Sequence, residues 1–151
     1  MPLNHARKGK EYEPVTVTVE REHVLQFADA IGEDNPVFRD AEAARALGYP
    51  GQIAPPTFAT VMQIMTSGQA VLDPELGLNY ALVVHGEQEY EWQRPLLVGE
   101  TLRATPRIAD IYSRGPNEFL VIEAEIEDEA GNAVGLSRST LLSRGTAGSG
   151  A

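Results

Sequence analysis

The chain has 151 residues, of which 42% are hydrophobic and 23% are charged, and these proportions are typical of one globular domain. Its 22 acidic and 12 basic residues give a formal net charge of -10, which disfavours binding to the phosphate backbone of a nucleic acid. Since there is no cysteine, disulfides, thiolate metal sites and a cysteine nucleophile are excluded, and a cytoplasmic location is expected.

The two ends of the chain differ in composition from the part between them. Residues 1–10 are polar and basic without the apolar stretch of a secretory signal, and residues 145–151 are small or polar. Segments of this kind at the ends of a domain usually fray. We therefore expect one domain over residues 11–144, with flexible segments at 1–10 and 145–151.

The first part of the domain predicts one strand and two helices. Alternating valine and threonine indicate a β-strand over residues 12–19. Apolar residues at helical spacing follow over residues 20–31, and Gly32 provides a stop at their C-terminal end. Residues 40–47 indicate a short helix with Asp40 as its N-cap.

The segment 52–72 contains no charged residue and predicts a long central helix. Pro55 and Pro56 stand near its start, where the first N–H groups of a helix have no internal partner. An apolar stripe follows, made of Phe58, Val61, Met62, Met65 and Leu72. The opposite face carries Thr, Ser, Gln and Ala, so the helix is expected to be enclosed on most of its circumference. Its polar content and prolines argue against a membrane span.

Residues 82–92 predict a strand with one covered and one wet face. Leu82, Val84, Gln88, Tyr90 and Trp92 form the covered set. His85 falls on the wet face, together with three glutamates.

Three further strands complete the predicted sheet, at residues 100–112, 119–127 and 133–142, and Pro106 indicates an edge or a bulge in the first of them. A helix followed by a run of strands is typical of the α+β class. We expect a single hot-dog fold, in which a curved antiparallel sheet wraps a long central helix. A sheet of this size usually needs a second copy alongside, so a dimer is expected.

Several motifs resemble the MaoC-like dehydratase family. They are Phe27-Ala-Asp-Ala-Ile-Gly-Glu-Asp-Asn-Pro-Val-Phe-Arg-Asp40, Gly48-Tyr49, Ile53-Ala-Pro-Pro-Thr-Phe58, Val84-His-Gly-Glu-Gln88, Arg94-Pro-Leu and Gly99-Glu-Thr-Leu102. They occur in the order and at the spacing of the family, over residues 12–144. The chain looks closest to the single-domain subgroup that resembles the HadA-type, substrate-binding subunits of two-subunit (R)-3-hydroxyacyl-thioester dehydratases.

The resemblance implies a dehydration reaction and indicates that this chain lacks part of the catalytic Asp and His pair. In the hydratase members, an Asp and a His in a Gly-Asp-x-Asn-Pro-x-His pattern move the protons, and N–H groups at the start of the buried helix hold the thioester oxygen. Here the pattern runs from Gly32 to Phe38, with Glu33 in place of the Asp and Phe38 in place of the His. Because phenylalanine carries no proton, the isolated chain is expected to be inactive.

The candidate catalytic residue is Glu33, which is either a surviving base beside a pocket or a solvated loop carboxylate. The substrate-binding candidates are Asn35, Pro56, Thr57, Phe58, Met62 and His85. Each of them also has a structural interpretation. A turn explains Asn35, helix capping explains Pro56 to Phe58, core packing explains Met62, and a dimer contact explains His85.

No cofactor and no metal site are expected, because three dispersed histidines do not form a ligand pattern. Arg94 could meet a phosphate group or pair with one of the many glutamates. The expected ligand is an acyl thioester of coenzyme A or of an acyl carrier protein. Neither a nucleic acid nor a membrane is expected as a partner.

Three functions stay open. In the first, the chain is the substrate-binding component of a dehydratase or enoyl hydratase of fatty-acid metabolism, in a heterodimer whose other hot-dog subunit supplies the Asp and His. In the second, it is a homodimeric dehydratase or thioesterase that uses Glu33. In the third, it binds acyl thioesters without turnover.

Overall fold

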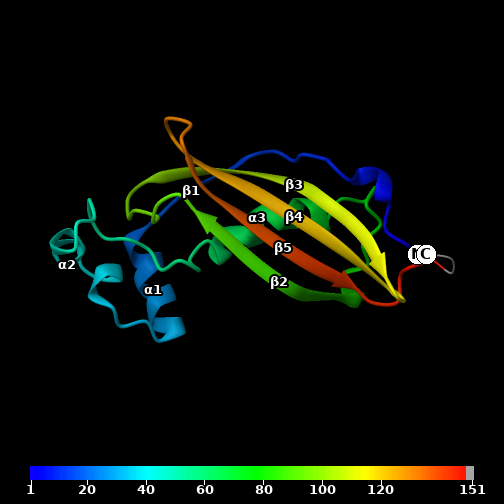
Figure 1. Ribbon diagram of the computed structural model, residues 1–151, viewed down its shortest axis with the longest axis horizontal. Helices are drawn as coiled ribbons and strands as arrows, with labels where there is room; N and C mark the ends of the chain where they lie inside the picture. The colour runs from blue at the N-terminus through cyan, green and yellow to red at the C-terminus, as the bar shows by residue number, and fades with distance from the viewer. Residues whose placement is uncertain (149–151) are drawn as a thin grey trace.

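The computed structural model describes residues 1–148, in which an antiparallel sheet curves around helix α3 (Thr60–Val71) (Figure 1). The strands are β1 (Val15–Thr18), β2 (Val83–Trp92), β3 (Thr101–Arg114), β4 (Asn117–Asp128) and β5 (Ala133–Ser143). They form one five-stranded sheet in the order β1-β3-β4-β5-β2. Helices α1 (Arg21–Ile31) and α2 (Ala41–Ala46) lie together at one end of the sheet (Figure 1). The predicted α+β hot-dog fold is confirmed.

Short 3-10 helices connect these elements: η1 (His5–Arg7), η2 (Pro36–Phe38) and η3 (Tyr80–Leu82). No helix among residues 1–148 is both long enough and apolar enough to cross a membrane.

Two clusters of buried side chains fill the space between α3 and the sheet. We call the first the proximal cluster; it contains Val19, Val24, Ala54, Phe58, Ala59, Met62, Leu96, Leu102, Ala104, Ala124, Ile126 and Val134. We call the second the distal cluster; it contains Leu3, Ala70, Leu76, Ile108, Ile111, Leu120, Ile122 and Leu141. The inner face of the sheet thus contributes apolar side chains at alternate positions, as the period of a strand requires.

The ends of the two short helices follow from local chemistry. Helix α1 stops at Gly32, which adopts the left-handed conformation with φ 69°. Helix α2 starts after Asp40, whose carboxylate accepts hydrogen bonds from Glu42 N at 3.2 Å and Ala43 N at 3.4 Å. Both caps are confirmed.

The central helix begins later than the prolines suggest. The chain turns from Pro55 onward, with hydrogen bonds from Phe58 N to Pro55 O at 2.9 Å and from Thr60 N to Thr57 O at 3.0 Å. These three-residue steps keep the turn tight, and regular α-helix starts only at Thr60. The prolines therefore lie in a tight turn that leads into α3.

Strand β2 carries a β-bulge that changes the face of its first residues. His85 lies opposite Leu141 of β5, whereas Glu87 lies opposite Thr140, so Gly86 is an extra residue. Leu141 belongs to the inner face, and His85 therefore faces α3. The prediction that His85 shares a face with the glutamates is wrong, because strict alternation cannot allow for a bulge.

Pro106 lies in β3 just beyond the end of the short strand β1, whose pairing stops at Ala104. There the Pro106 carbonyl accepts a hydrogen bond from Tyr12 N at 2.9 Å. The irregularity of β3 comes further along, between Ile108 and Asp110. Pro106 thus occupies a position at which no neighbouring strand requires its missing N–H group.

The N-terminal residues are packed against the domain, in contrast to the fraying that their composition predicts. Leu3 is only 4% exposed, and Asn4 N donates to Leu76 O at 2.9 Å. Of the expected C-terminal tail at 145–151, residues 149–151 lie outside the described part of the chain.

Candidate functional site

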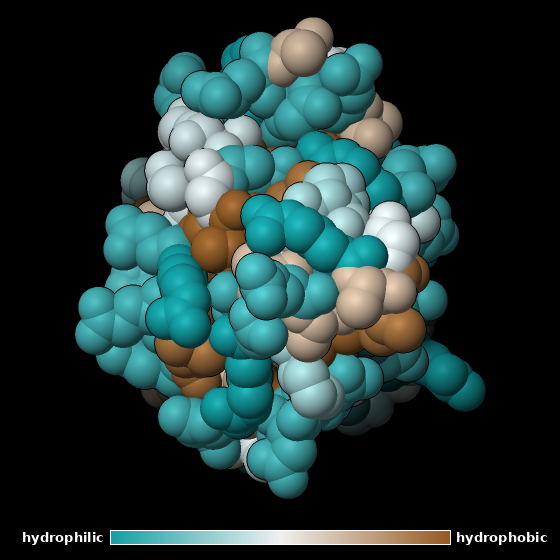
Figure 2. Space-filling view, turned by 90° about the vertical axis from the view of Figure 1, so that its left-hand side faces the viewer, coloured by the Kyte–Doolittle hydropathy of each residue, from teal (hydrophilic) through white to brown (hydrophobic). Residues whose placement is uncertain are grey.

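A hollow of about 460 Å³ opens at the end of the molecule that carries α1 and α2. We call it the entrance hollow; it is lined by Asn35, Val37, Phe38, Leu47, Tyr49, Ile53, Ala54, Pro55, Pro56, Trp92, Gln93, Arg94, Pro95 and Leu96. Figure 2 looks onto this end and shows apolar surface gathered between hydrophilic side chains. Such a mixture of apolar walls and a few polar groups is typical of a small-molecule site.

The turn before η2 brings Asn35 into the hollow and keeps Glu33 out of it. The Asn35 side chain accepts a hydrogen bond from Val37 N at 3.2 Å and so caps η2. One carboxylate oxygen of Glu33 accepts from Asn35 N at 2.9 Å, and the Glu33 carbonyl accepts from Arg39 Nη2 at 2.7 Å. Glu33 is not among the residues that line the hollow. Its carboxylate therefore stabilises the turn.

Phe38 lines the hollow at the position where the hydratase pattern has its histidine. Its backbone is fixed, because the Phe38 carbonyl accepts a hydrogen bond from the buried Gln52 side chain at 2.8 Å. Among the described residues that line the hollow there is neither a carboxylate nor an imidazole. The hollow can therefore hold an apolar or uncharged group, but it has no side chain suited to general acid–base catalysis near neutral pH.

The segment 55–59 begins at the wall of the hollow and leads into α3. Pro55 and Pro56 line the hollow, and the Pro56 carbonyl accepts a hydrogen bond from Trp92 Nε1 at 3.1 Å. The side chain of Thr57 is exposed. Within residues 1–148, the N–H groups of Thr57 and Ala59 donate to no acceptor. These two groups are the free backbone donors at the start of the central helix.

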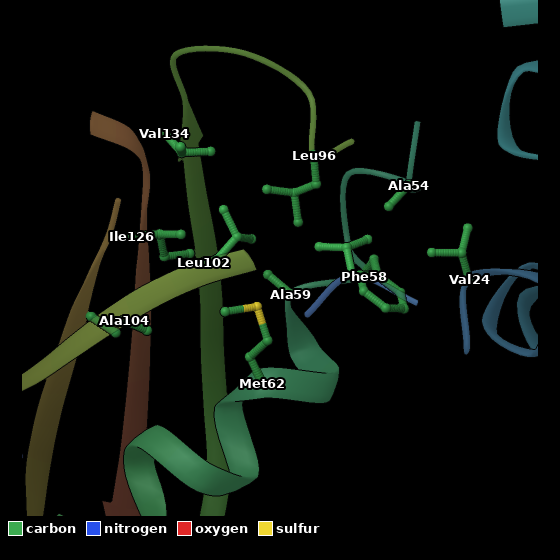
Figure 3. Packing of buried hydrophobic residues seen from close by; sticks show 12 residues of the cluster. Val24, Ala54, Phe58, Ala59, Met62, Leu96, Leu102, Ala104, Ile126 and Val134 are labelled. Atoms are coloured by element: carbon green, nitrogen blue, oxygen red, sulfur yellow. The ribbon is translucent and has the colours of Figure 1, made fainter. Parts of the chain in front are cut away.

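Phe58 and Met62 are each 2% exposed and belong to the proximal cluster, with their side chains directed into it (Figure 3). The Phe58 ring packs edge-on against Phe27, with ring centroids 5.6 Å apart. The two residues therefore support the wall of the site from behind and do not line the hollow.

Two aromatic residues that the sequence analysis did not select lie at the inner wall. Trp92 lines the hollow and stacks on Tyr90, with ring centroids 5.7 Å apart. The Tyr90 hydroxyl hydrogen-bonds with Thr60, and burial raises the pKa of Tyr90, so the phenol stays protonated. Gly135 leaves room for the indole, since a Cβ atom there would collide with Trp92. The sequence signal that could have identified them is their alternation, which places Tyr90 and Trp92 together on the covered face of the strand.

Arg94, at the rim of the entrance hollow, forms ion pairs with carboxylates. Its guanidinium donates to both carboxylate oxygens of Glu100, at 3.0 and 2.8 Å, and lies 3.6 Å from Asp128. Hydrogen bonding to Glu100 raises the pKa of Arg94 above its ordinary value, so this side chain stays charged. Of the two roles considered for Arg94, the structure has the pairing with glutamate.

A second hollow of about 440 Å³ runs between α3 and β2. We call it the lateral groove; it is lined by Thr60, Gln63, Ile64, Ser67, Gly68, Val71, Tyr80, Val83, His85 and Leu141. His85 lies here, with Nε2 2.9 Å from the Glu87 carbonyl. The candidate residues are therefore divided. Asn35 and Pro56 share the entrance hollow, and His85 lies in the groove.

One flank of the molecule is apolar and uncovered. Val61, Ile64, Met65 and Leu72 follow one face of α3 at helical spacing and are 43%, 82%, 46% and 80% exposed. Tyr80 extends this surface at 74% exposure, beside β2, which is an edge strand of the sheet. We call these five residues the α3 flank.

Comparison with known proteins finds one matching family profile and several related sequences. The profile of a family described as "FAS1-like, dehydratase domain region" matches residues 6–136. The chain is 45% identical over 148 residues to a UPF0336 protein of Saccharopolyspora erythraea, a match that covers 97% of this chain and 95% of the relative.

Two solved complexes of Mycobacterium tuberculosis are similar in structure. One is the C-terminally truncated HadBC complex, a (3R)-hydroxyacyl-ACP dehydratase, with a TM-score of 0.82, 27% identity and coverage of 90% of this chain and 96% of that chain. The other is the ChsH1–ChsH2 complex, with a TM-score of 0.73, 25% identity and coverage of 93% and 87%.

Proposed function

Because this chain belongs to the family of FAS1-like dehydratase domain regions and has the hot-dog fold of MaoC-like dehydratases, we propose that it is the substrate-holding subunit of an (R)-3-hydroxyacyl-thioester dehydratase. One observation carries the proposal. The entrance hollow keeps the Asn35 turn of the family, but it presents Phe38 and contains no carboxylate or imidazole within the described residues.

The reaction requires two proton transfers that these residues cannot perform. A base removes the proton from the α-carbon of the acyl thioester, and an acid protonates the hydroxyl group on the neighbouring carbon, which leaves as water. An Asp and a His on a second subunit would supply both groups. The present chain would hold the acyl group.

The free N–H groups of Thr57 and Ala59 support a role in holding the thioester. During removal of the α-proton, negative charge develops on the thioester oxygen, and backbone donors at the start of a helix stabilise such charge. Pro56, the neighbour of Thr57, lines the hollow. The thioester could be delivered by coenzyme A or by an acyl carrier protein.

The α3 flank supports pairing with a second hot-dog subunit. An edge strand beside an apolar helix face is the surface that a partner can extend and cover. The two complexes to which the chain is similar are each named for two components, as HadBC and as ChsH1–ChsH2. We propose a heterodimer in which the partner carries the complete Asp and His pattern.

The test is formation of the enoyl thioester from a 3-hydroxyacyl thioester by the chain alone, by a dyad-bearing hot-dog subunit of the same organism alone, and by the two together. The proposal predicts no turnover by the chain alone and turnover by the pair that exceeds the sum of the separate proteins. Turnover by the chain alone would indicate a homodimeric dehydratase or thioesterase. Binding without turnover under every condition would indicate a non-enzymatic acyl-binding module.

A further inference from the structure

We propose that the N-terminal segment 2–10 is an end stop for the acyl chain, and that Leu3 sets the length of chain that the protein accepts. The inference rests on the proposed function, because the ligand is the acyl group of the thioester. It adds a specificity-determining residue far from the entrance hollow.

The position of the segment is the first argument. Figure 1 shows the N-terminal segment at the end of the sheet opposite to α1 and α2, with α3 between the two ends. The entrance hollow lies at the α1 and α2 end, and the lateral groove follows α3 from Thr60 to Val71. An acyl chain that enters at the hollow and follows α3 therefore points toward the N-terminal segment.

Leu3 belongs to the buried apolar core at that far end. It is 4% exposed and belongs to the distal cluster, together with Leu141. Leu141 also lines the lateral groove, and so do Val71 and Val83, which pack against the same cluster. Leu3 thus belongs to the same apolar cluster as residues that line the groove.

A buried carboxylate holds Leu3 in place. The side chain of Glu118 on β4 is 1% exposed and accepts a hydrogen bond from Leu3 N at 2.8 Å. Its other oxygen lies 2.9 Å from Nε2 of His5. A carboxylate removed from water in this way is stable only while its donors stay in place. Glu118 is therefore a positioning residue for Leu3.

A second set of contacts fixes the segment to the loop that follows α3. Arg7 donates to Asp73 at 2.7 Å and pairs with Glu75, and the Asn4 side chain donates to the Glu75 carbonyl at 3.0 Å. Because Asp73 and Glu75 directly follow the last turn of α3, the segment is tied to the end of the central helix. The stop and the helix along which the acyl chain would lie therefore form one unit.

The test is binding of butyryl-, octanoyl-, dodecanoyl- and hexadecanoyl-coenzyme A to the assembled pair, measured by titration calorimetry. Leu3→Ala removes about three carbons from the stop. It should strengthen binding of chains longer than the wild-type optimum by about fourfold for each further methylene that is buried, which corresponds to about 0.8 kcal/mol. Leu3→Phe should move the optimum to shorter chains.

Two further variants separate the stop from a general effect on stability. Val24→Ala truncates a fully buried side chain of the proximal cluster and should leave the preferred length unchanged. Glu118→Ala should shift the optimum in the same direction as Leu3→Ala and add little to it in the double variant. Should Leu3→Ala fail to fold, Leu3→Val should give a smaller shift of the same sign.

An unchanged length preference in a folded Leu3 variant would overturn the end stop and leave the proposed function standing. Absence of binding of every acyl thioester to the wild-type pair would overturn the proposed function, and the end stop with it.

Discussion

Phe38 and Asn35 stand three residues apart in one turn. Asn35 stabilises the backbone of the turn, whereas Phe38 occupies the position at which acid–base chemistry is expected. Asn35 caps η2 through its side chain, a backbone need that any member of the fold with this turn shares. Phe38 places an apolar ring where the hydratase pattern has its histidine, and its carbonyl accepts a hydrogen bond from the Gln52 side chain. The turn is thus kept for its shape, whereas its acid–base chemistry is absent.

Glu33 is predicted to be dispensable for turnover of the assembled pair. In Glu33→Gln the amide oxygen can still accept the hydrogen bond from Asn35 N. The rate should therefore change by less than about threefold, whereas loss of a general acid or base costs about 100- to 10,000-fold. Steady-state rates of enoyl thioester formation test this. A loss of the larger size would show that Glu33 is the base of the reaction.

At the scale of single elements, the sequence predicts the helix ends, because these depend on interactions between neighbouring residues. The stop of α1 at Gly32 and the cap of α2 at Asp40 depend only on neighbouring residues, and the sequence predicts both. The face of His85 depends on how β2 pairs with β5, about fifty positions away in the chain. The local trace of the bulge is Gly86, where a Cβ atom would lie 3.2 Å from the Thr140 carbonyl.

The candidate site was predicted in part for the same reason. Motif positions gave Asn35 and Pro56, which do line the entrance hollow. Phe58 and Met62 share one helical stripe in the sequence, and periodicity alone cannot distinguish a tunnel wall from the core in which they lie. Trp92 was missed because its role depends on the space that Gly135 leaves on the adjacent strand.

The α3 flank predicts that Ile64→Lys prevents assembly without unfolding the chain. Ile64 is 82% exposed, so the substitution should change the free energy of unfolding of the isolated chain by no more than about 0.5 kcal/mol. A lysine at the centre of an apolar interface should weaken binding of the partner by about 30-fold or more, about 2 kcal/mol.

Sedimentation of the mixed subunits measures this loss of assembly. The matched control is Ile31→Lys, which changes an apolar side chain of 50% exposure at the end of α1, away from the flank. Equal affinity of the wild type and Ile64→Lys for the partner would place the interface elsewhere.

At the scale of the whole molecule, contacts between distant parts of the chain decide the ends of the domain. The composition of residues 1–10 predicts a frayed segment, since it has few apolar residues to bury. Yet Arg7 meets Asp73, Lys8 meets Asp110 and His5 meets Glu118. Local sequence patterns cannot predict these pairs. Each carboxylate comes from a different part of the chain, and only folding brings the three to the same end of the sheet.

The cluster of Arg7, Tyr12 and Asp73 predicts how stability depends on pH. Burial and a hydrogen bond to Asp73 raise the pKa of Tyr12 from 10.0 to about 12. Burial acts to raise the pKa of Asp73, but hydrogen bonds from Arg7 and Tyr12 outweigh it and hold that pKa below its ordinary 3.8. Tyr12 therefore contributes stability that is complete below pH 10.0 and is lost as the pH rises to about 12. Asp73 contributes stability that is lost as the pH falls below 3.8.

Urea unfolding of the wild type and Tyr12→Phe across the alkaline range measures this dependence. The variant should be less stable at neutral pH, because it lacks the hydrogen bond to Asp73, and its stability should fall less steeply between pH 10.0 and about 12. Parallel curves for the two proteins would show that Tyr12 does not carry the alkaline loss.

The central claim is that this chain holds the substrate while a second subunit performs the proton transfers. Its most direct test is the dehydration rate of the reconstituted pair in which the histidine of the partner's complete pattern is replaced by alanine. The account predicts a fall of at least about 100-fold with acyl-thioester binding retained, because the entrance hollow offers no acid or base to take over. An undiminished rate, abolished only when Glu33→Gln is added, would contradict it.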